Sequence, residues 1–337
     1  MTLDLTALDS TTRLLFTIEL KPLQGDRFQP TGFPSLGAAT YETATGTKLL
    51  VESAQSMANR METTCWDPVA NAPIAALEGV SHVTVTRLGA FLTDSMLEAH
   101  RLNSPYLLEN KKDPSFKDAL VVSLGGLASG PINRKLLSET LLKYDVGSLL
   151  HGVFLAKQEL AGGRLRVARA LSAFIEATGA RVAASGGVKN DHVNPSGDTK
   201  SGFGNVPFAR DEFTADSIHL HVNFDLAQVR GYGLGKDAER LLVLLGLHRL
   251  RKLLDGDLRL RTACDLEPIA RDRVVAQRPS GFELPALKAL EDALQGAIKK
   301  CASAMTHTTV KYDEKLDSAK ERAAAAEDDD GDESGED

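Results

Sequence analysis

Two segments of the chain alternate strictly between apolar and polar side chains, and this alternation restricts the fold more than any other feature. Arg13–Lys21 and Ser217–Leu226 each place large apolar residues on one face and polar or charged residues on the other. A period of two is the side-chain period of a β-strand with one buried face. Pro22 ends the first segment because proline has no N–H for the ladder. We therefore expect a mainly antiparallel sheet with one face on the core.

Helical and strand patterns alternate along the rest of the chain, without an internal repeat. This mixture predicts the α+β class, with helices packed on one face of the sheet. An RRM-like (ferredoxin-like) core with inserted segments fits the order, and we expect residues 1–320 to form a single domain. Helices are predicted at about 52–63, 134–142, 164–179, 236–254 and 286–305. Further strands are predicted at 83–85, 119–124, 147–155, 180–188 and 258–263.

The acidic charge is concentrated in the segment 321–337. This segment contains nine acidic residues and one basic residue, whereas the whole chain has a net charge of -7. The remainder therefore carries +1, and a body with balanced charge can still present one basic face. Because the segment has no apolar residue larger than alanine, we expect it to be a disordered acidic tail.

Several features exclude a membrane or secreted protein. The longest apolar run, Leu241–Leu247, is far shorter than the roughly 20 residues that a transmembrane helix needs. The polar, acidic start MTLDLTALDS does not have the pattern of a secretory signal. Three scattered cysteines form neither a disulfide framework nor a zinc pattern. We therefore expect a cytoplasmic protein without membrane contact.

The segment Lys189–Arg210 is the longest stretch without a regular pattern. It combines cations and amides with two aromatic residues, Phe203 and Phe208. Loops this long inside compact domains are usually functional or disordered. Interleaved cations and aromatics are typical of sites for single-stranded nucleic acid, where cations contact phosphates and aromatics stack on bases. In the alternative interpretation, both phenylalanines pack back onto the body.

Four other groups of residues have a functional and a structural interpretation. His219 and His221 share one strand face, but the sequence brings no third metal ligand close to them. Asp191 and His192 could belong to a hydrolytic site, yet no nucleophile motif accompanies them. The glycines at 231, 233 and 235 could admit a phosphate at a helix start, or simply cap that helix. We expect a solvated basic face for the cations at 249, 251, 252, 259 and 261, and neither metal nor cofactor.

Three segments together resemble a known family. They read FTIELKPLQGDRFQPTGFPSLG, LLVESAQSMANRMET and RALSAFIEATGARVAASGGVKNDHVNP, and the most specific pieces are ESAQSMANR and SGGVKND. The chain resembles the backbone (Cas-seven) subunit of the type I-G, formerly I-U, CRISPR Cascade complex, in the RAMP superfamily. The resemblance extends over about residues 12–273.

The resemblance implies an RRM-like palm with insertions and a thumb-like loop or hairpin at about 189–214. It further implies that several copies stack head-to-tail along one CRISPR RNA and contact other Cascade subunits. Each thumb would displace a base, and the guide would be presented to a target DNA strand in antiviral defence. Type I backbone subunits are not nucleases, so the resemblance implies binding rather than catalysis.

The residue chemistry and the resemblance together predict the RNA contacts. Lys200–Arg210 is expected to form the thumb tip, with Phe203 as the wedge between bases. The alternative is a RAMP-family ribonuclease that cuts guide or target RNA with Asp191 and His192, or with the histidine pair on the strand. The predicted RNA-binding residues are Lys21, Arg27, Gln55, Ser56, Asn59, Arg60, Lys189, Asn190, His192, Lys200, Phe203 and Arg210.

Overall fold

The computed structural model describes residues 3–33, 37–44, 46–126, 131–256 and 258–314, and the acidic segment 321–337 lies outside them. Its largest element is a seven-stranded sheet in which all neighbouring strands are antiparallel. This sheet confirms the predicted mixture of helices with an antiparallel sheet. In order across the sheet, the strands are β16 (Leu258–Arg261), β17 (Cys264–Pro268), β1 (Arg13–Pro22), β15 (Ser217–Asp225), β12 (Leu171–Thr178), β5 (Gly46–Glu52) and β4 (Thr40–Thr43).

The two alternating segments form the directly paired strands β1 and β15. Phe16 lies opposite Val222, and Thr17 lies opposite His221. The apolar positions of both strands are buried, whereas the polar positions between them are half-buried or exposed. Because register and side-chain period agree, one face of the sheet is packed on the core and the other stays open.

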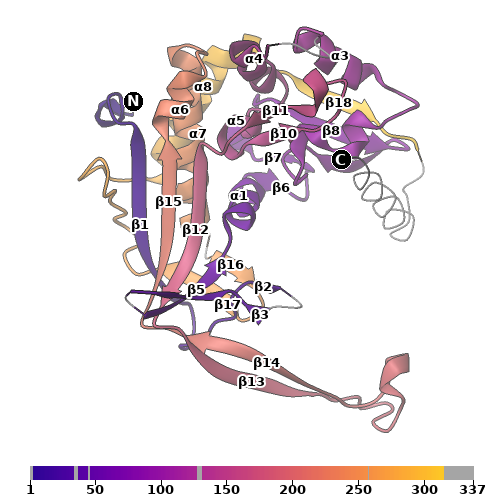
Figure 1. Ribbon diagram of the computed structural model, residues 1–337, viewed down its shortest axis with the longest axis vertical. Helices are drawn as coiled ribbons and strands as arrows, with labels where there is room; N and C mark the ends of the chain where they lie inside the picture. The colour runs from indigo at the N-terminus through magenta and orange to yellow at the C-terminus, as the bar shows by residue number, and fades with distance from the viewer. Residues whose placement is uncertain (1–2, 34–36, 45, 127–130, 257, 315–337) are drawn as a thin grey trace, which may run out of the picture.

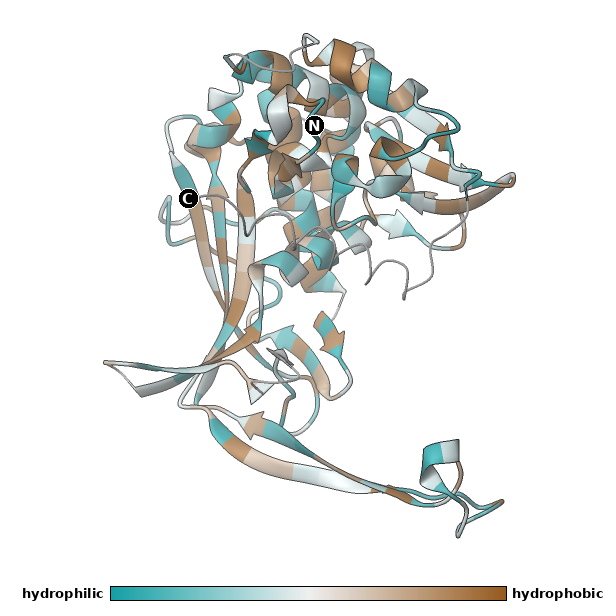
Figure 2. Cartoon of the chain, turned by 45° about the vertical axis from the view of Figure 1, so that its right-hand side comes forward, coloured by the Kyte–Doolittle hydropathy of each residue, from teal (hydrophilic) through white to brown (hydrophobic). Residues whose placement is uncertain are grey.

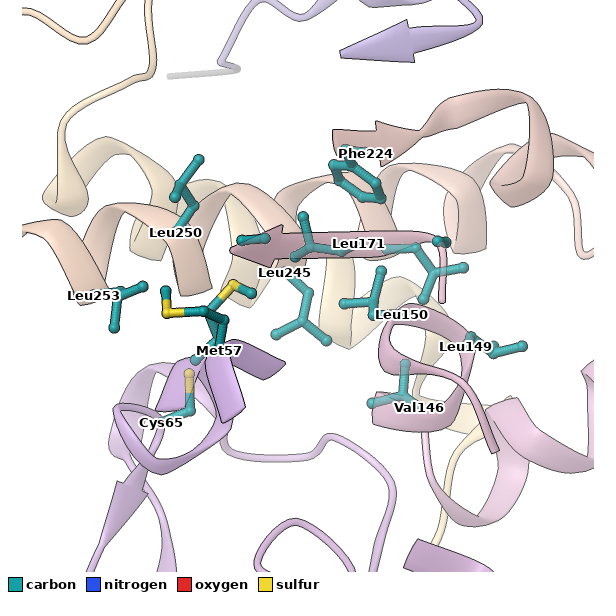
Figure 3. Packing of buried hydrophobic residues seen from close by; sticks show 14 of the residues in the cluster. Met57, Cys65, Val146, Leu149, Leu150, Leu171, Phe224, Leu245, Leu250 and Leu253 are labelled. Carbon is teal, nitrogen blue, oxygen red and sulfur yellow. The ribbon is translucent and has the colours of Figure 1, made fainter. Parts of the chain in front are cut away.

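Helices cover the apolar face of the main sheet (Figure 1). Gly246 lets α7, the longest of the described helices, approach the sheet closely, because a Cβ atom there would lie 2.5 Å from the Phe224 ring. Met57, Leu150 and Leu245, from three different helices, lie in the same apolar interior (Figure 3). The helices of this layer are α1 (Ala54–Thr63), α5 (Gly147–His151), α6 (Leu226–Gly231), α7 (Lys236–Asp255) and α8 (Leu287–Cys301).

A smaller three-stranded sheet lies to the side of this core. Its outer strand, β18, runs parallel to β8 and joins the end of the described chain to a segment more than 200 residues earlier. Helices α3 and α4 lie beside it (Figure 1). The elements of this region are β8 (His82–Arg87), β9 (Ala90–Asp94), β18 (His307–Lys311), α2 (Pro105–Leu108), α3 (Ser115–Ser123) and α4 (Arg134–Tyr144). Short strand pairs are β2 (Gly32–Phe33) with β3 (Gly37–Ala38), β6 (Trp66–Asp67) with β7 (Ala72–Pro73), and β10 (Val153–Leu155) with β11 (Leu165–Val167).

A two-stranded hairpin projects from the end of the main sheet, away from the helices (Figures 1 and 2). Its strands β13 (Arg181–Lys189) and β14 (Val206–Thr214) pair along their whole length. Nine residues at about 3.3 Å each give the hairpin a reach of about 30 Å. The sequence predicted an irregular segment at 189–210. Its last five residues instead belong to β14.

The predicted helix at 164–179 is wrong. The segment forms β11 and then β12, a central strand between β15 and β5. Leu171, Ala173, Ile175 and Ala177 are buried, and the residues between them are half-buried. Because the apolar residues of this segment satisfy both a helical and a strand period, the neighbouring strands decide its conformation.

Two predicted strands are also wrong. The segment 147–155 begins as the buried helix α5, which Gly152 ends with a φ of 82°, and only then continues as β10. The segment 119–124 belongs mostly to α3. Both are short apolar runs, whose pattern does not separate a buried helix from a buried strand. Within the described part of the chain, no helix is both long enough and apolar enough to span a bilayer.

Candidate nucleic-acid interface

Helix α1 turns one face to the core and the other outward. The Ser53 hydroxyl caps the helix by accepting the N–H of Ser56 at 3.3 Å. Met57 is buried, whereas Gln55 and Asn59 are exposed and hydrogen-bonded to each other at 3.1 Å. Three of the predicted contacts on this helix, Gln55, Ser56 and Asn59, therefore lie at or near its outer face.

Arg60, the fourth predicted contact on α1, is engaged inside the protein. Its guanidinium donates to the Glu52 carboxylate at 3.3 Å and to the carbonyl oxygens of Arg259, at 3.0 Å, and Leu260. Arg261 contacts the same carboxylate of Glu52, which is buried. Arg60 thus ties α1 to β16, and its contact with RNA stays a prediction.

A hollow of about 650 Å³ opens beside the start of α1. Its walls come from α1, from the segment before α2, from the first residue of α4 and from β10 and β11. Among the residues that the structure describes, no aspartate or glutamate lines it. We call it the cationic pocket, defined by Gln55, Phe154 and the basic residues His100, Arg101, Arg134, His151, Arg166 and Arg169.

The arginines of the cationic pocket differ in their partners. Arg101 is buried and forms a two-pronged ion pair with buried Glu62, so it adds little net charge. For Arg134, Arg166 and Arg169, the described residues provide no carboxylate partner, and Arg169 donates to the amide oxygen of Gln55. A guanidinium matches a phosphate in geometry and charge. The pocket is therefore suited to bind anions.

His151 lies in this pocket and is only 4% exposed. Neither of its ring nitrogens has a well-aligned hydrogen-bond partner in the described part of the chain. Burial lowers the pKa of His151 well below its usual value, and Arg249 and Arg101 lower it further, whereas a hydrogen bond to the Leu171 backbone raises it. The ring is therefore neutral at pH 7 and offers one donor and one acceptor.

A network of buried charges supports the pocket from behind. Glu62 pairs with Arg249 at 3.3 Å as well as with Arg101. Nearby, Asp145 accepts the hydroxyl of Ser148 at 2.6 Å. Burial raises the pKa of Asp145 to about 6, with Arg101 opposing the shift. This network holds Arg101 rigidly in the pocket wall.

The expected solvated basic face at 249–261 is largely wrong. Arg249 is 1% exposed, and Arg251 is also buried, with Asp255 as its partner. Arg261 is half-buried against Glu52, and only Arg259 of these four arginines is widely exposed. The reason is that α7 is packed on nearly all sides, so its arginines must be neutralised by carboxylates.

The hairpin holds six of the predicted contacts. Phe203 and Phe208 are 52% and 51% exposed, so the interpretation in which both pack onto the body is wrong. Arg210 lies within β14 and donates to Glu212 at 2.9 Å, so the loop between the strands is shorter than predicted. The other contacts, Lys189, Asn190, His192, Lys200 and Phe203, are exposed at the far end of the hairpin.

Asp191 organises the loop at the end of the hairpin. Its carboxylate accepts the N–H groups of Val193, Asn194 and Gly204, each at 2.9 Å. These bonds lower the pKa of Asp191. A carboxylate held in this way shapes the backbone of the loop, which is a structural role.

The remaining predicted contacts lie near the lower end of β1. Lys21 pairs with Glu267 at 3.2 Å, and Arg27 is exposed in the loop that follows. The predicted residues therefore occupy three places: helix α1, the end of β1 and the hairpin. The structure joins only Gln55 to the cationic pocket.

The other candidate groups have structural surroundings. His221 stacks on Phe174 with ring centroids 5.1 Å apart on the open face of the sheet. In the described ranges, no three or more His, Cys, Asp or Glu side chains gather in a way that could hold a metal ion. Gly235, with a φ of 86°, precedes α7, and Lys236 pairs with Glu239 at 2.8 Å. The glycine-rich turn therefore serves as a helix cap.

Sequence reasoning missed most of the cationic pocket. Arg166 and Arg169 stood in the segment predicted as a helix, and His151 stood in one predicted as a strand. The cluster of arginines at 164–169 was a signal in the sequence. The partners of these residues, on α1 and α4, are far away in the chain, and only the fold brings them together.

Comparison with known proteins gives one family. No curated protein sequence matches the chain. The solved structures that match the chain include a chain of "CRISPR RNA-guided surveillance complex, pre-nicking" (15% identity, TM-score 0.41, covering 76% of this chain and 73% of that one). Another is Csc2 of Thermofilum pendens (9% identity, TM-score 0.31, covering 88% and 79%). The family model of CRISPR-associated protein GSU0053 matches residues 14–182, half of the chain. The chain therefore belongs to the family of CRISPR-associated protein GSU0053.

Proposed function

We propose that this protein is the CRISPR RNA-binding backbone (Cas-seven) subunit of a type I Cascade surveillance complex of subtype I-G. One observation carries the proposal: a concave pocket lies within the segment that matches a CRISPR-associated family, and three of its arginines have no carboxylate partner among the described residues. In an otherwise charge-balanced body, such a concentration of cations is a site for a polyanion.

In this proposal the pocket binds phosphates of the guide, and the hairpin contacts its bases. Guanidinium groups bind phosphates irrespective of sequence, which suits a subunit that must accept any spacer. Base pairing between guide and target DNA then reads the sequence, while the protein reads backbone and shape. Phe203, half-exposed at the end of the hairpin, provides a surface on which a base can stack.

The hairpin supports the assembly part of the proposal. An isolated two-stranded ribbon is at best marginally stable in water, so a projecting one gains from contact with another surface. We propose that it acts as the thumb on an RRM-like palm, crosses the guide and contacts the next copy. Copies then stack head-to-tail, since a track of RNA requires a repeating translation, and other Cascade subunits cap the filament.

The test is co-purification with guide RNA. The subunit is produced together with its CRISPR array and partner subunits, and the extracted RNA is sequenced. We expect discrete repeat–spacer RNA in a particle with several copies of the subunit. Random cellular RNA, or none, would contradict the proposal. A variant with Arg166→Ala and Arg169→Ala should lose RNA, whereas Arg273→Ala, at an exposed pair with Glu283, serves as the matched control.

We further propose that the subunit binds RNA without cutting it. Asp191 is occupied by three backbone N–H groups, which leaves the ribonuclease alternative without support from that residue. The discriminating assay incubates the subunit with guide and complementary RNA, with and without divalent cations. Intact RNA in both arms is expected. Cleavage that His219→Ala or His192→Ala abolishes would favour the ribonuclease.

A further inference from the structure

The cationic pocket is larger and has more polar groups than a site for a phosphate alone needs. A phosphodiester passing over a surface requires only exposed cations. This pocket has a volume of about 650 Å³, in the range of sites for whole small molecules. It also contains groups that no phosphate would satisfy, and these groups define what else must enter.

His151 is the most informative of these groups. Its two ring nitrogens are buried, and neither has a well-aligned partner among the described residues; burial keeps the ring neutral, and the Leu171 backbone lies close to one nitrogen. A buried polar group without a partner is destabilising, so such groups in native proteins call for an explanation. A neutral imidazole has one donor and one acceptor nitrogen; the Leu171 backbone can accept from the donor, so the acceptor nitrogen needs a donor from the ligand. An ionised phosphate diester offers acceptors only, whereas the edge of a nucleobase offers both.

The neighbours of His151 complete a binding site for a nucleotide. The side chain of Phe154 is 53% exposed and lines the pocket, so its ring offers a stacking surface. The Nε of Arg169 is buried and has no partner among the described residues. Gln55 accepts from that arginine and donates one amide N–H to Asn59, so its second amide N–H remains for a ligand. Arg134 and Arg166 are exposed on the wall and can reach a phosphate.

A tight backbone turn at Gly152 shapes one wall of the pocket. Gly152 has a φ of 82°, and a Cβ atom there would lie 2.7 Å from the carbonyl oxygen of Val167. Only glycine therefore allows the chain to turn from His151 into β10 so close to β11. The turn places His151, directly before the glycine, and Phe154, two residues after it, around the same cavity.

We infer that the cationic pocket binds one whole nucleotide, with its phosphate on Arg134 and Arg166 and the edge of its base against His151. The nucleotide has two possible sources with the same chemistry: a unit turned out of an RNA strand, or a free nucleoside monophosphate. The first source rests on the proposed function, and the second does not.

The experiment uses the RNA-free full chain. Binding of AMP, CMP, GMP, UMP and inorganic phosphate is measured by calorimetry, and binding of a short single-stranded RNA is measured alongside. We expect at least one monophosphate to bind about tenfold or more tightly than inorganic phosphate. His151→Phe keeps an aromatic ring but removes both ring nitrogens. It should abolish the tighter binding of the monophosphate while leaving phosphate binding unchanged. Arg166→Ala should weaken all ligands, and Arg273→Ala should weaken none.

A second measurement protects the test against a variant that does not fold. The ring nitrogens of His151 in the unaltered chain are followed by ¹⁵N NMR, and their shifts should change on addition of the nucleotide but not of inorganic phosphate. Monophosphates that bind no better than phosphate, with no such change either for them or for RNA, would overturn the inference. An effect with RNA alone identifies the strand as the source. If the inference fails but repeat–spacer RNA still co-purifies, the proposed function stands.

Discussion

Two groups of arginines in this protein have opposite surroundings. Arg249 and Arg251 of α7 are buried and paired with Glu62 and Asp255. The arginines of the cationic pocket that face outward, such as Arg166, have no carboxylate partner among the described residues. In the sequence, the first group looks like the stronger basic cluster. The fold shows that the number of cations in a segment does not indicate whether that segment binds nucleic acid. What matters is whether each cation already has a carboxylate partner within the protein.

The difference has a physical basis. A charge that leaves water must be compensated, so the arginines of α7 are bound to carboxylates and hydrogen-bond acceptors of their own protein. Arginines at a concave, hydrated surface carry no such requirement and remain available to an anion. The first group should therefore control stability and the second binding.

The largest expected effect concerns Glu62. Glu62→Gln removes the charge that compensates Arg101 and Arg249, so two buried cations are left without their carboxylate. We expect the free energy of unfolding to fall by about 3–5 kcal/mol, measured by denaturant titration. The matched control is Glu283→Gln, at an exposed pair, with an expected change within about 0.5 kcal/mol. Equal effects of the two variants would show that the buried network is not what holds Arg101.

The next effect is a dependence of stability on pH that comes from Asp145. Its folded-state pKa, about 6, lies above the usual aspartate value of 3.8. Between these values the folded protein keeps a proton that the unfolded chain has released, so the contribution of Asp145 to stability falls as pH rises from about 4 to 6. The fall is at most about 3 kcal/mol and ends above the folded-state pKa.

The measurement compares the unaltered chain with Asp145→Asn from pH 4 to 7. The comparison is needed because His248, whose pKa burial lowers to about 4, gives the opposite slope over the same range. The stability difference between the two chains should decline with rising pH and then become constant. A stability difference that stays constant from pH 4 upward would show that the pKa of Asp145 is not raised in the folded protein.

A third prediction concerns the pocket itself. Arg134→Ala with Arg166→Ala should reduce affinity for single-stranded RNA by about tenfold to hundredfold at low salt. The slope of log affinity against log salt should become shallower by about 1.4, because two phosphate contacts are lost. Stability should change little. The reverse pattern is expected for Arg251→Ala: lower stability, and unchanged RNA affinity of the folded protein.

The smallest expected effect is at the end of the hairpin. Phe203→Ala should leave thermal stability unchanged, since the side chain is half-exposed, and should weaken RNA binding by about 1 kcal/mol through lost stacking. Filter binding at fixed salt measures the effect. Phe213→Ala, at a buried position near the base of the same hairpin, should instead destabilise the protein. If Phe203→Ala acts on stability alone, the hairpin is not a binding element.

The sequence predicted some elements well and others poorly, for physical reasons. β1 and β15 have long alternating patterns that only a half-buried strand satisfies. The segment of β12 is apolar at both periods, and its identity as a strand comes from pairing with β15 and β5, which are distant in sequence. The pocket was missed for the same reason. Of its polar residues only Gln55 was predicted, because the others form a binding site only when the fold brings them together.

The most direct test of the account is to map the RNA contacts in the assembled complex by ultraviolet cross-linking and mass spectrometry. We predict cross-linked peptides from the pocket, at 99–103 and 151–169, and from the end of the hairpin, at 189–205. The buried arginines of α7 should give none. Cross-links confined to other surfaces, with the pocket and hairpin peptides unmodified, would contradict the claim that arginines without carboxylate partners mark the interface.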